Sequence, residues 1–129
     1  MGVIKHKDVP VRERRVGHRV RNLVSPETGA SGLTLTVNEL DPGAGVPLHT
    51  HRVEEALVVQ KGMGVFRLGP SEVIVGADAT VLVPAEVAHA FRNDGPGVLQ
   101  VLGVFPVVDP LTARWTTYLE GNEPLGFRA

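Results

Sequence analysis

The sequence contains no cysteine among its 129 residues. Disulfide bonds, thiolate metal ligands and cysteine nucleophiles are therefore all excluded, and the composition is compatible with a reducing cytoplasm. An excess of charge is also absent, because 13 lysines and arginines stand against 14 acidic residues and leave a net charge of −1. This balance gives no electrostatic reason to expect binding to nucleic acid or to an anionic membrane.

Long apolar segments are absent as well. No run reaches the ~18–20 residues that a membrane-spanning helix needs, and residues 1–10 lack the apolar core of a secretory signal. We therefore expect a cytoplasmic protein without a membrane partner. The length suits one domain, and it is too short for two barrels in tandem.

Short β-branched segments separated by glycine and proline make up most of the chain. Their spacing of about ten residues is typical of an all-β sandwich or barrel. Strands are expected at Gly17–Val24, Leu33–Leu40, Ala56–Gln60, Val65–Leu68, Val73–Val75, Thr80–Val83, Ala88–Arg92 and Val98–Phe105.

Two patterns indicate how these strands are buried. Residues 33–38 alternate between apolar and polar side chains, which predicts a strand with one buried face. Ala56–Gln60 and Val98–Phe105 are almost wholly apolar, so both faces of these strands should be covered. A homodimer interface would cover the outer faces, and we expect a homodimer.

The C-terminal residues 106–129 allow two interpretations. Asp109 could cap a helix with Pro110 in its first position, running through Trp115 and Tyr118. A further strand is the alternative. In either case, Trp115 and Tyr118 could cover the barrel mouth or pack in a dimer.

Candidate metal ligands are concentrated in residues 42–62. His49 and His51 are separated by one residue, so in a strand both imidazoles lie on the same face, about 6.6 Å apart along the backbone. Side chains that converge from this separation can share one ion at the ~2.0–2.1 Å bonds that imidazole makes. Glu55 shares a face with Leu57 in the next strand, where a carboxylate is costly without a positive partner. A solvated surface pair of histidines is the alternative.

The spacing of these residues resembles the cupin family. The fixed positions of the first cupin motif are matched by Gly43, His49, His51, Glu55 and Gly62. Residues 84–93 resemble the second motif, in which His89 matches the third histidine ligand and Asn93 the closing asparagine. The resemblance covers about residues 33–105, and it implies an all-β double-stranded β-helix, the jelly-roll barrel of small single-domain cupins. Residues 1–32 would add N-terminal strands, and residues 106–129 a C-terminal extension.

The resemblance also implies a metal site. His49, His51, Glu55 and His89 would together bind one divalent ion per chain, with Fe, Mn, Ni, Zn and Cu all compatible with this donor set. Four protein ligands leave two positions of an octahedral ion open, as in a catalytic or ligand-binding site. A degenerate cupin with little affinity for metal is the alternative.

Two positions depart from the second motif. Glu86 stands where the family usually has glycine two residues after the proline, and Asp78 stands where a glycine usually opens the motif. If Glu86 requires a positive φ, its backbone is strained.

Few residues are available to complete a substrate pocket. Phe91 should face the same way as His89, either as a core aromatic or as a surface on which substrate stacks. Arg19 or Arg21 could clamp a carboxylate or an enolate, although a solvated face is the alternative. Gln60 is a further polar candidate, whereas His6 and His18 lie outside both motifs and are expected to be exposed.

The resemblance implies a metal-dependent enzyme of dioxygenase, decarboxylase or isomerase type acting on a small oxygen-rich molecule. The enzyme would thus be an oxidoreductase or an isomerase. A non-catalytic barrel that binds or senses a small ligand is the alternative, and a purely structural barrel is a third interpretation.

Overall fold

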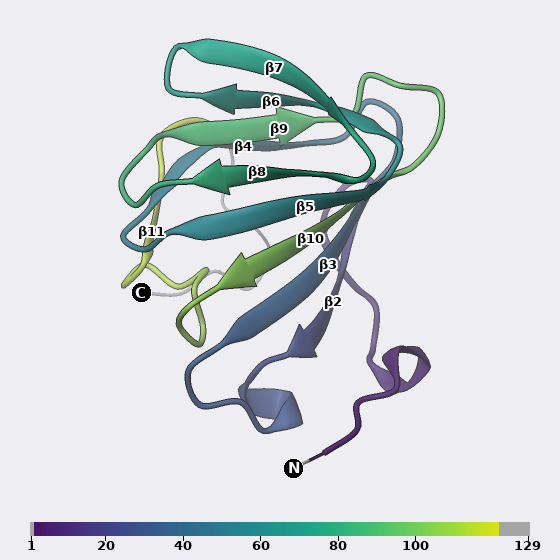
Figure 1. Ribbon diagram of the computed structural model, residues 1–129, viewed down its shortest axis with the longest axis vertical. Coiled ribbons are helices and arrows are strands. Elements are labelled where there is room, and N and C mark those ends of the chain that lie inside the picture. Colours follow the sequence, from purple (N-terminus) through teal and green to yellow (C-terminus); the bar gives the residue numbers. More distant parts are fainter. Residues whose placement is uncertain (1, 122–129) are drawn as a thin grey trace.

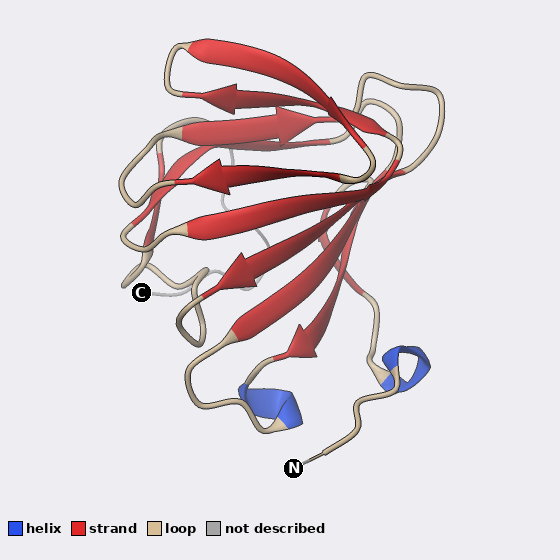
Figure 2. Ribbon diagram, viewed as in Figure 1, coloured by secondary structure: helices blue, strands red, loops and turns tan. Residues whose placement is uncertain are grey.

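The strands form two antiparallel sheets in the computed structural model, which describes residues 2–121 (Figures 1 and 2). The six-stranded sheet has the order β1 (Arg12–Arg15), β2 (His18–Val24), β3 (Thr34–Leu40), β10 (Leu99–Phe105), β5 (Glu55–Lys61) and β8 (Ala79–Val83). The five-stranded sheet has the order β11 (Thr116–Tyr118), β4 (Gly45–His51), β9 (His89–Arg92), β6 (Met63–Leu68) and β7 (Ser71–Gly76). Two short 3₁₀ helices, η1 (His6–Asp8) and η2 (Pro26–Thr28), complete the secondary structure of the described residues.

The chain crosses repeatedly from one sheet to the other. From β3 to β6, and again from β8 to β11, each successive strand belongs to the opposite sheet. This connectivity is that of a jelly-roll barrel, and it confirms the fold expected from the sequence. The apolar core lies between the sheets and consists of Leu40, Leu57, Val59, Phe66, Val81, Val83, Phe91, Leu99 and Val101. Among residues 2–121, no helix is long and apolar enough to span a lipid bilayer.

The strands expected from periodicity are all present, with ends that differ by a residue or two. For the C-terminal segment, the strand interpretation is confirmed at Thr116–Tyr118, and residues 109–115 form turns rather than a helix. N-terminal strands were expected within residues 1–32, but the position of the arginine-rich strand β1 was not predicted. Its side chains do not alternate between apolar and polar, so periodicity gives no sign of it.

Strand β3 buries its polar face and turns its apolar face outward. Thr34, Thr36 and Asn38 are buried, whereas Leu35 and Val37 lie half-buried on the outer side. The buried polar atoms have partners, since Thr34 Oγ1 donates to the carbonyl of residue 107 at 2.8 Å and Asn38 Nδ2 to the carbonyl of residue 101 at 3.3 Å. These hydrogen bonds offset the cost of removing the polar groups from water. This end of the barrel interior is therefore polar.

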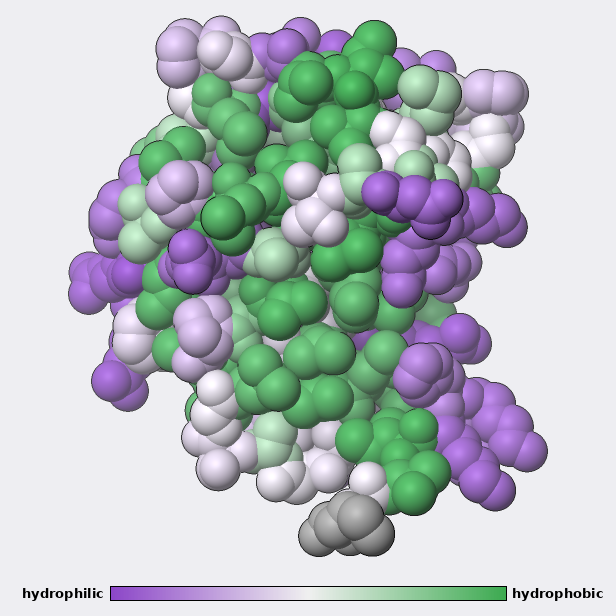
Figure 3. Space-filling view, viewed as in Figure 1, coloured by the Kyte–Doolittle hydropathy of each residue, from purple (hydrophilic) through white to green (hydrophobic). Residues whose placement is uncertain are grey.

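The outer face of the six-stranded sheet is correspondingly apolar. Val58, Leu102 and Val104 lie half-buried on it, and Leu82 is 59% exposed. Figure 3 shows hydrophobic residues gathered over the face on which β5, β10 and β3 lie in Figure 1. This surface, together with Val37, is called the outer apolar face below.

The two departures from the second motif both have a left-handed backbone. Asp78 has a φ of 68° and Glu86 a φ of 69°, so each side chain occupies a conformation that favours glycine. The strain expected at Glu86 is therefore present. By contrast, Gly62 at the end of the first motif has a φ of 79°, and a Cβ there would meet the carbonyl oxygen of Val98 at 2.6 Å.

Candidate metal centre

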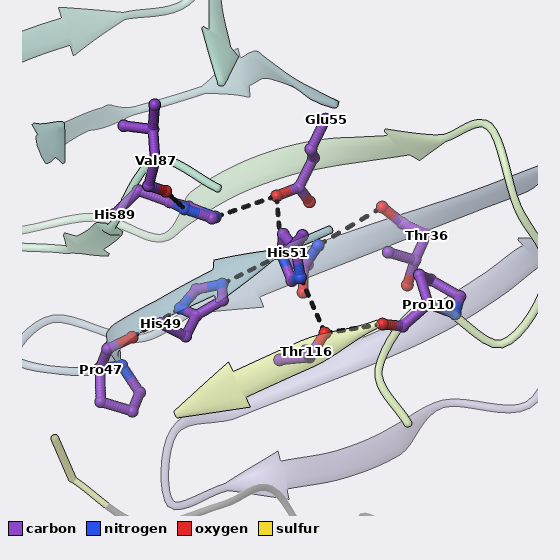
Figure 4. A network of polar contacts seen from close by, with 10 residues as sticks. Thr36, Pro47, His49, His51, Glu55, Val87, His89, Pro110 and Thr116 are labelled. Carbon is purple, nitrogen blue, oxygen red and sulfur yellow. Dashed lines mark hydrogen bonds and ion pairs between the residues drawn. The ribbon is translucent and has the colours of Figure 1, made fainter. Parts of the chain in front are cut away.

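The four predicted ligands meet at one point inside the barrel. His49 and His51 come from β4, Glu55 is the first residue of β5, and His89 is the first residue of β9. Strand pairing places His49 opposite His89, and all four side chains point toward one another in Figure 4. One donor atom from each lies within 4.8 Å of the others, and all four residues are buried.

The distances between donor atoms suit a single ion. His49 Nε2 lies 3.1 Å from His51 Nε2, and Glu55 Oε1 lies 3.2 Å from the Nε2 atoms of both His51 and His89. Two ligands bonded at ~2.1 Å and at right angles around one ion are separated by about 3.0 Å. The donor atoms would therefore need little movement to bind an ion.

Hydrogen bonds behind the histidines fix which nitrogen of each ring faces the centre. Nδ1 of His49 lies 2.7 Å from the carbonyl of Pro47, and Nδ1 of His89 lies 2.9 Å from the carbonyl of Val87. A carbonyl only accepts, so both Nδ1 atoms carry the hydrogen. The Nε2 atoms then present lone pairs to the centre, which is how a protein orients metal-binding histidines.

His51 is oriented through a hydroxyl relay. Its Nδ1 lies 2.7 Å from Thr116 Oγ1, and that hydroxyl donates to the carbonyl of Pro110 at 2.6 Å. Because the hydroxyl hydrogen is used in this second bond, Thr116 Oγ1 accepts from Nδ1–H of His51. All three imidazoles thus carry their hydrogen on the outer nitrogen.

The protonation state of the centre fits a cation. Because His49 and His51 each carry their hydrogen on Nδ1, the lone pairs of their Nε2 atoms face each other at 3.1 Å with no hydrogen between them. Burial, together with the neighbouring His89 and His51, lowers the pKa of His49 to about 3, so His49 does not readily take up a proton. An ion shared by the two nitrogens would remove this repulsion.

Glu55 supplies the negative charge of the centre. Burial alone would raise the pKa of Glu55, but the positions of His51 and His89 beside its carboxylate outweigh this effect and lower the pKa to about 2. Gly103 on β10 leaves space for the carboxylate, because a Cβ there would lie 3.3 Å from Glu55 Oε2. Three imidazoles and one carboxylate form a donor set that suits Fe, Mn, Ni, Cu or Zn.

A small cavity of about 40 Å³ lies against three of the ligands, His49, His51 and Glu55. Its other polar lining residues are Arg14, Arg15, His18, Thr36, Asn38 and Tyr118. The expectation that His18 is exposed was wrong, because β2 turns it inward and leaves it 4% exposed. Its Nε2 lies 2.8 Å from Asn38 Oδ1, and burial lowers its pKa to about 4.

The residues expected to form the substrate pocket are dispersed. Phe91 does line the cavity, and it also stacks on Phe66 in the core with 5.2 Å between ring centroids. Arg19 instead forms a 2.9 Å ion pair with Asp41, and exposed Gln60 accepts a hydrogen bond from Gln100.

Arg21 alternates with inward-facing Val20 and pairs across the sheet with Val37, on the outer side. Arg19, Arg21 and Gln60 are absent from the described residues that line the cavity. Their contact with substrate stays a prediction.

Strand β11 brings in two residues that the motifs do not contain. Thr116 pairs with His51 across the strands and Tyr118 pairs with His49. The Tyr118 ring lies 5.4 Å from the His49 ring, and the guanidinium of Arg15 lies 5.4 Å from the centre of the tyrosine ring. In the sequence, only the i, i+2 spacing of Thr116 and Tyr118 hints that both face the same way.

A jelly-roll barrel that buries three histidines and a glutamate around one point defines a barrel of cupin type. The family model described as "Cupin domain" matches residues 36–105, and the chain belongs to this family. The buried cluster is typical of a cupin metal site.

Named relatives agree with this assignment. Auxin-binding protein 1 of Arabidopsis thaliana is 32% identical over 83 residues, which cover 57% of this chain and 42% of that protein. The chain thus spans less than half the length of this curated relative. The polyketide cyclase RemF from Streptomyces resistomycificus superposes with a TM-score of 0.79 at 23% identity, covering 95% of this chain and 88% of that one. A predicted oxalate decarboxylase from Thermotoga maritima gives 0.71 at 23% identity, covering 83% and 100%. Both structural likenesses concern the fold.

Proposed function

We propose that this cupin is a metal-dependent enzyme that acts on a small oxygen-rich molecule, by dioxygenase, decarboxylase or isomerase chemistry. The observation that carries the proposal is the convergence of His49, His51, Glu55 and His89 on one point beside a cavity lined by further polar groups. A closed structural metal site has no need of such a cavity, whereas a catalytic site requires an open side.

The chain's own residues have defined tasks in this proposal. The four ligands hold a divalent ion, which when bound would act as a Lewis acid on two substrate oxygens and, if redox-active, exchange electrons with O₂. Tyr118, whose hydroxyl hydrogen-bonds with Arg15, lies beside His49 and offers polar contact to a substrate in the cavity. Phe105, which meets the His51 ring edge-on at 5.1 Å, lines the same cavity and offers an apolar contact to a substrate there.

The names of the structural neighbours support an enzyme. One is a polyketide cyclase and another a predicted oxalate decarboxylase, and both names denote catalysis on oxygen-rich molecules. Since these likenesses lie below 25% identity, they support the class of chemistry rather than a substrate.

A non-catalytic ligand-binding barrel is the second candidate function. The relative at 32% identity is named as a binding protein, and the cavity beside the ligands measures only about 40 Å³. That volume holds little more than one water molecule.

The test is a screen of the protein loaded separately with Fe(II), Mn(II), Ni(II), Cu(II) or Zn(II). Catechols, diketones and small keto acids are offered, with oxygen uptake, CO₂ release and product NMR as readouts. We expect turnover with at least one metal and none in the His51→Ala variant, which loses a ligand but keeps the apolar core. Tight ligand binding without turnover for every metal would contradict the proposal and favour the binding barrel.

We also propose that two copies of this chain pair through the outer apolar face, because its central side chains are uncharged and Leu82, on the edge strand β8, is more than half exposed. A cytoplasmic location stays an expectation drawn from the composition.

A further inference from the structure

Strand β1 places two consecutive arginines on the same side. In a regular strand Arg14 and Arg15 would point to opposite faces. The pairing of β1 with β2 is irregular between Glu13 and Arg15, and Arg14 has no partner in the register. Such a bulge re-aims a side chain, and both arginines are half-buried and line the cavity beside the metal ligands.

The positive charge of Arg14 has no carboxylate opposite it. Ion pairs join other arginines to acidic groups, as in Arg12 with Glu27 at 2.8 Å, but none joins Arg14 to an acidic residue anywhere in residues 2–121. Burial lowers the pKa of Arg14, Tyr118 acts in the opposite direction, and the nearby charges of Arg15 and Arg12 add to the lowering. A half-buried guanidinium without an anion is costly, so the site favours an anionic occupant.

The two arginines also lie where the metal cavity borders a larger groove. A groove of about 640 Å³ shares Arg14, Arg15, Val46 and Phe91 with the small cavity as lining residues. A ligand that reaches from this groove toward the metal centre would therefore pass along both guanidiniums. The groove provides the volume that the 40 Å³ cavity lacks.

We propose that the molecule bound at the metal centre carries a carboxylate, and that Arg14 and Arg15 bind this carboxylate at the border between groove and cavity. The inference rests on the proposed function, since it names the substrate class of the same site. Arginine binds carboxylates through two parallel hydrogen bonds, which fixes the orientation of the ligand as well as its charge. Arg14 is thus a specificity-determining residue.

The test measures binding to zinc-loaded protein by calorimetry and needs no turnover. Acetate, 2-oxobutanoate and salicylate are each compared with their uncharged amides, and inorganic phosphate serves as a second anion. In Arg14→Gln we expect at least one carboxylate to bind about 10- to 100-fold more weakly, as for the loss of a charged hydrogen bond. Its amide should bind wild type and variant equally weakly.

Two further variants separate the proposal from a general loss of structure. Arg12→Gln removes the same charge from the same strand, but at an exposed position that already pairs with Glu27, and should leave carboxylate binding unchanged. Arg14→Lys keeps the charge and should recover part of the affinity. Zinc content should be one per chain in all three.

Three results would overturn the inference. These are unchanged carboxylate binding in Arg14→Gln, an equal loss for acid and amide, or binding of phosphate but of no carboxylate. Carboxylate binding that depends on Arg14 in a protein without any turnover would leave the inference standing and refute only the enzymatic function. Turnover that is unchanged in Arg14→Gln would leave the enzymatic function standing and refute the inference about Arg14.

Discussion

The metal centre depends on one residue outside the cupin motifs, Thr116, through its hydroxyl. This hydroxyl accepts the hydrogen of His51 Nδ1 at 2.7 Å and passes its own to the carbonyl of Pro110 at 2.6 Å. Thr116→Val keeps the shape of the side chain and removes both bonds. The His51 ring then loses the contact that fixes its tautomer and its orientation.

The expected effect on metal binding follows from the role of such outer contacts. Removing a hydrogen-bond partner of a ligating histidine weakens metal affinity by about 10- to 100-fold. The metal-free protein should also lose about 1–3 kcal/mol of its free energy of unfolding, because Thr116 is 2% exposed and its loss leaves a buried ring N–H without an acceptor. Thr116→Ser retains the hydroxyl and should bind metal much like the wild type.

The assay is a competition for Zn(II) between the protein and a chromophoric chelator, repeated for each variant. Thr117→Val is the matched control, since Thr117 is the exposed neighbour on the same strand and pairs with Thr50 rather than with a candidate ligand. Unchanged zinc affinity in Thr116→Val, or an equal loss in Thr117→Val, would refute the hydroxyl relay.

Three other predictions concern strain, acid stability and association. Glu86→Gly should raise the free energy of unfolding by up to about 1 kcal/mol in urea titrations, because relief of the positive φ outweighs the entropy of glycine, while Glu86→Ala should not. The pKa of His18 is lowered from 6.5 to about 4, so the unfolded chain takes up the proton at a higher pH than the folded protein does. The contribution of neutral His18 to the free energy of unfolding is therefore complete above pH 6.5 and is lost as the pH falls to 4. His18 contributes about 3 kcal/mol of this loss, and His18→Gln should flatten the slope of urea-derived stability against pH in that range. Leu82→Glu should convert a dimer to a monomer in sedimentation at micromolar concentration, and a monomeric wild type would contradict the proposed interface.

The sequence predicts the barrel strands and the places of the four candidate ligands on them well because each depends on local spacing. The i, i+2 spacing of His49 and His51 fixes a shared face whatever the rest of the fold, and Glu55 begins an alternation that continues through Leu57. His89 lies in the second motif, far along the chain from the other three, and only its assignment required the resemblance to a family. The pairing of His49 with His89 then brings the third histidine in.

Features that arise from contacts between distant segments were not predictable in this way. The bulge that turns both Arg14 and Arg15 inward has no periodic signal, so the sequence pointed instead to Arg19 and Arg21 on the next strand. The burial of His18 and of the polar face of β3 depends on partners such as Asn38 and the carbonyl of residue 101, which become neighbours only in the folded barrel. A polar interior reverses the rule that the apolar face of a strand is the buried one.

The most direct measurement is anomalous X-ray diffraction from crystals of the protein prepared with one equivalent of a divalent ion such as Mn(II) or Zn(II). The account predicts one strong peak per chain, within bonding distance of the Nε2 atoms of His49, His51 and His89 and of Glu55 Oε1. A peak elsewhere, coordination through an Nδ1 atom, or no peak at this point would contradict it.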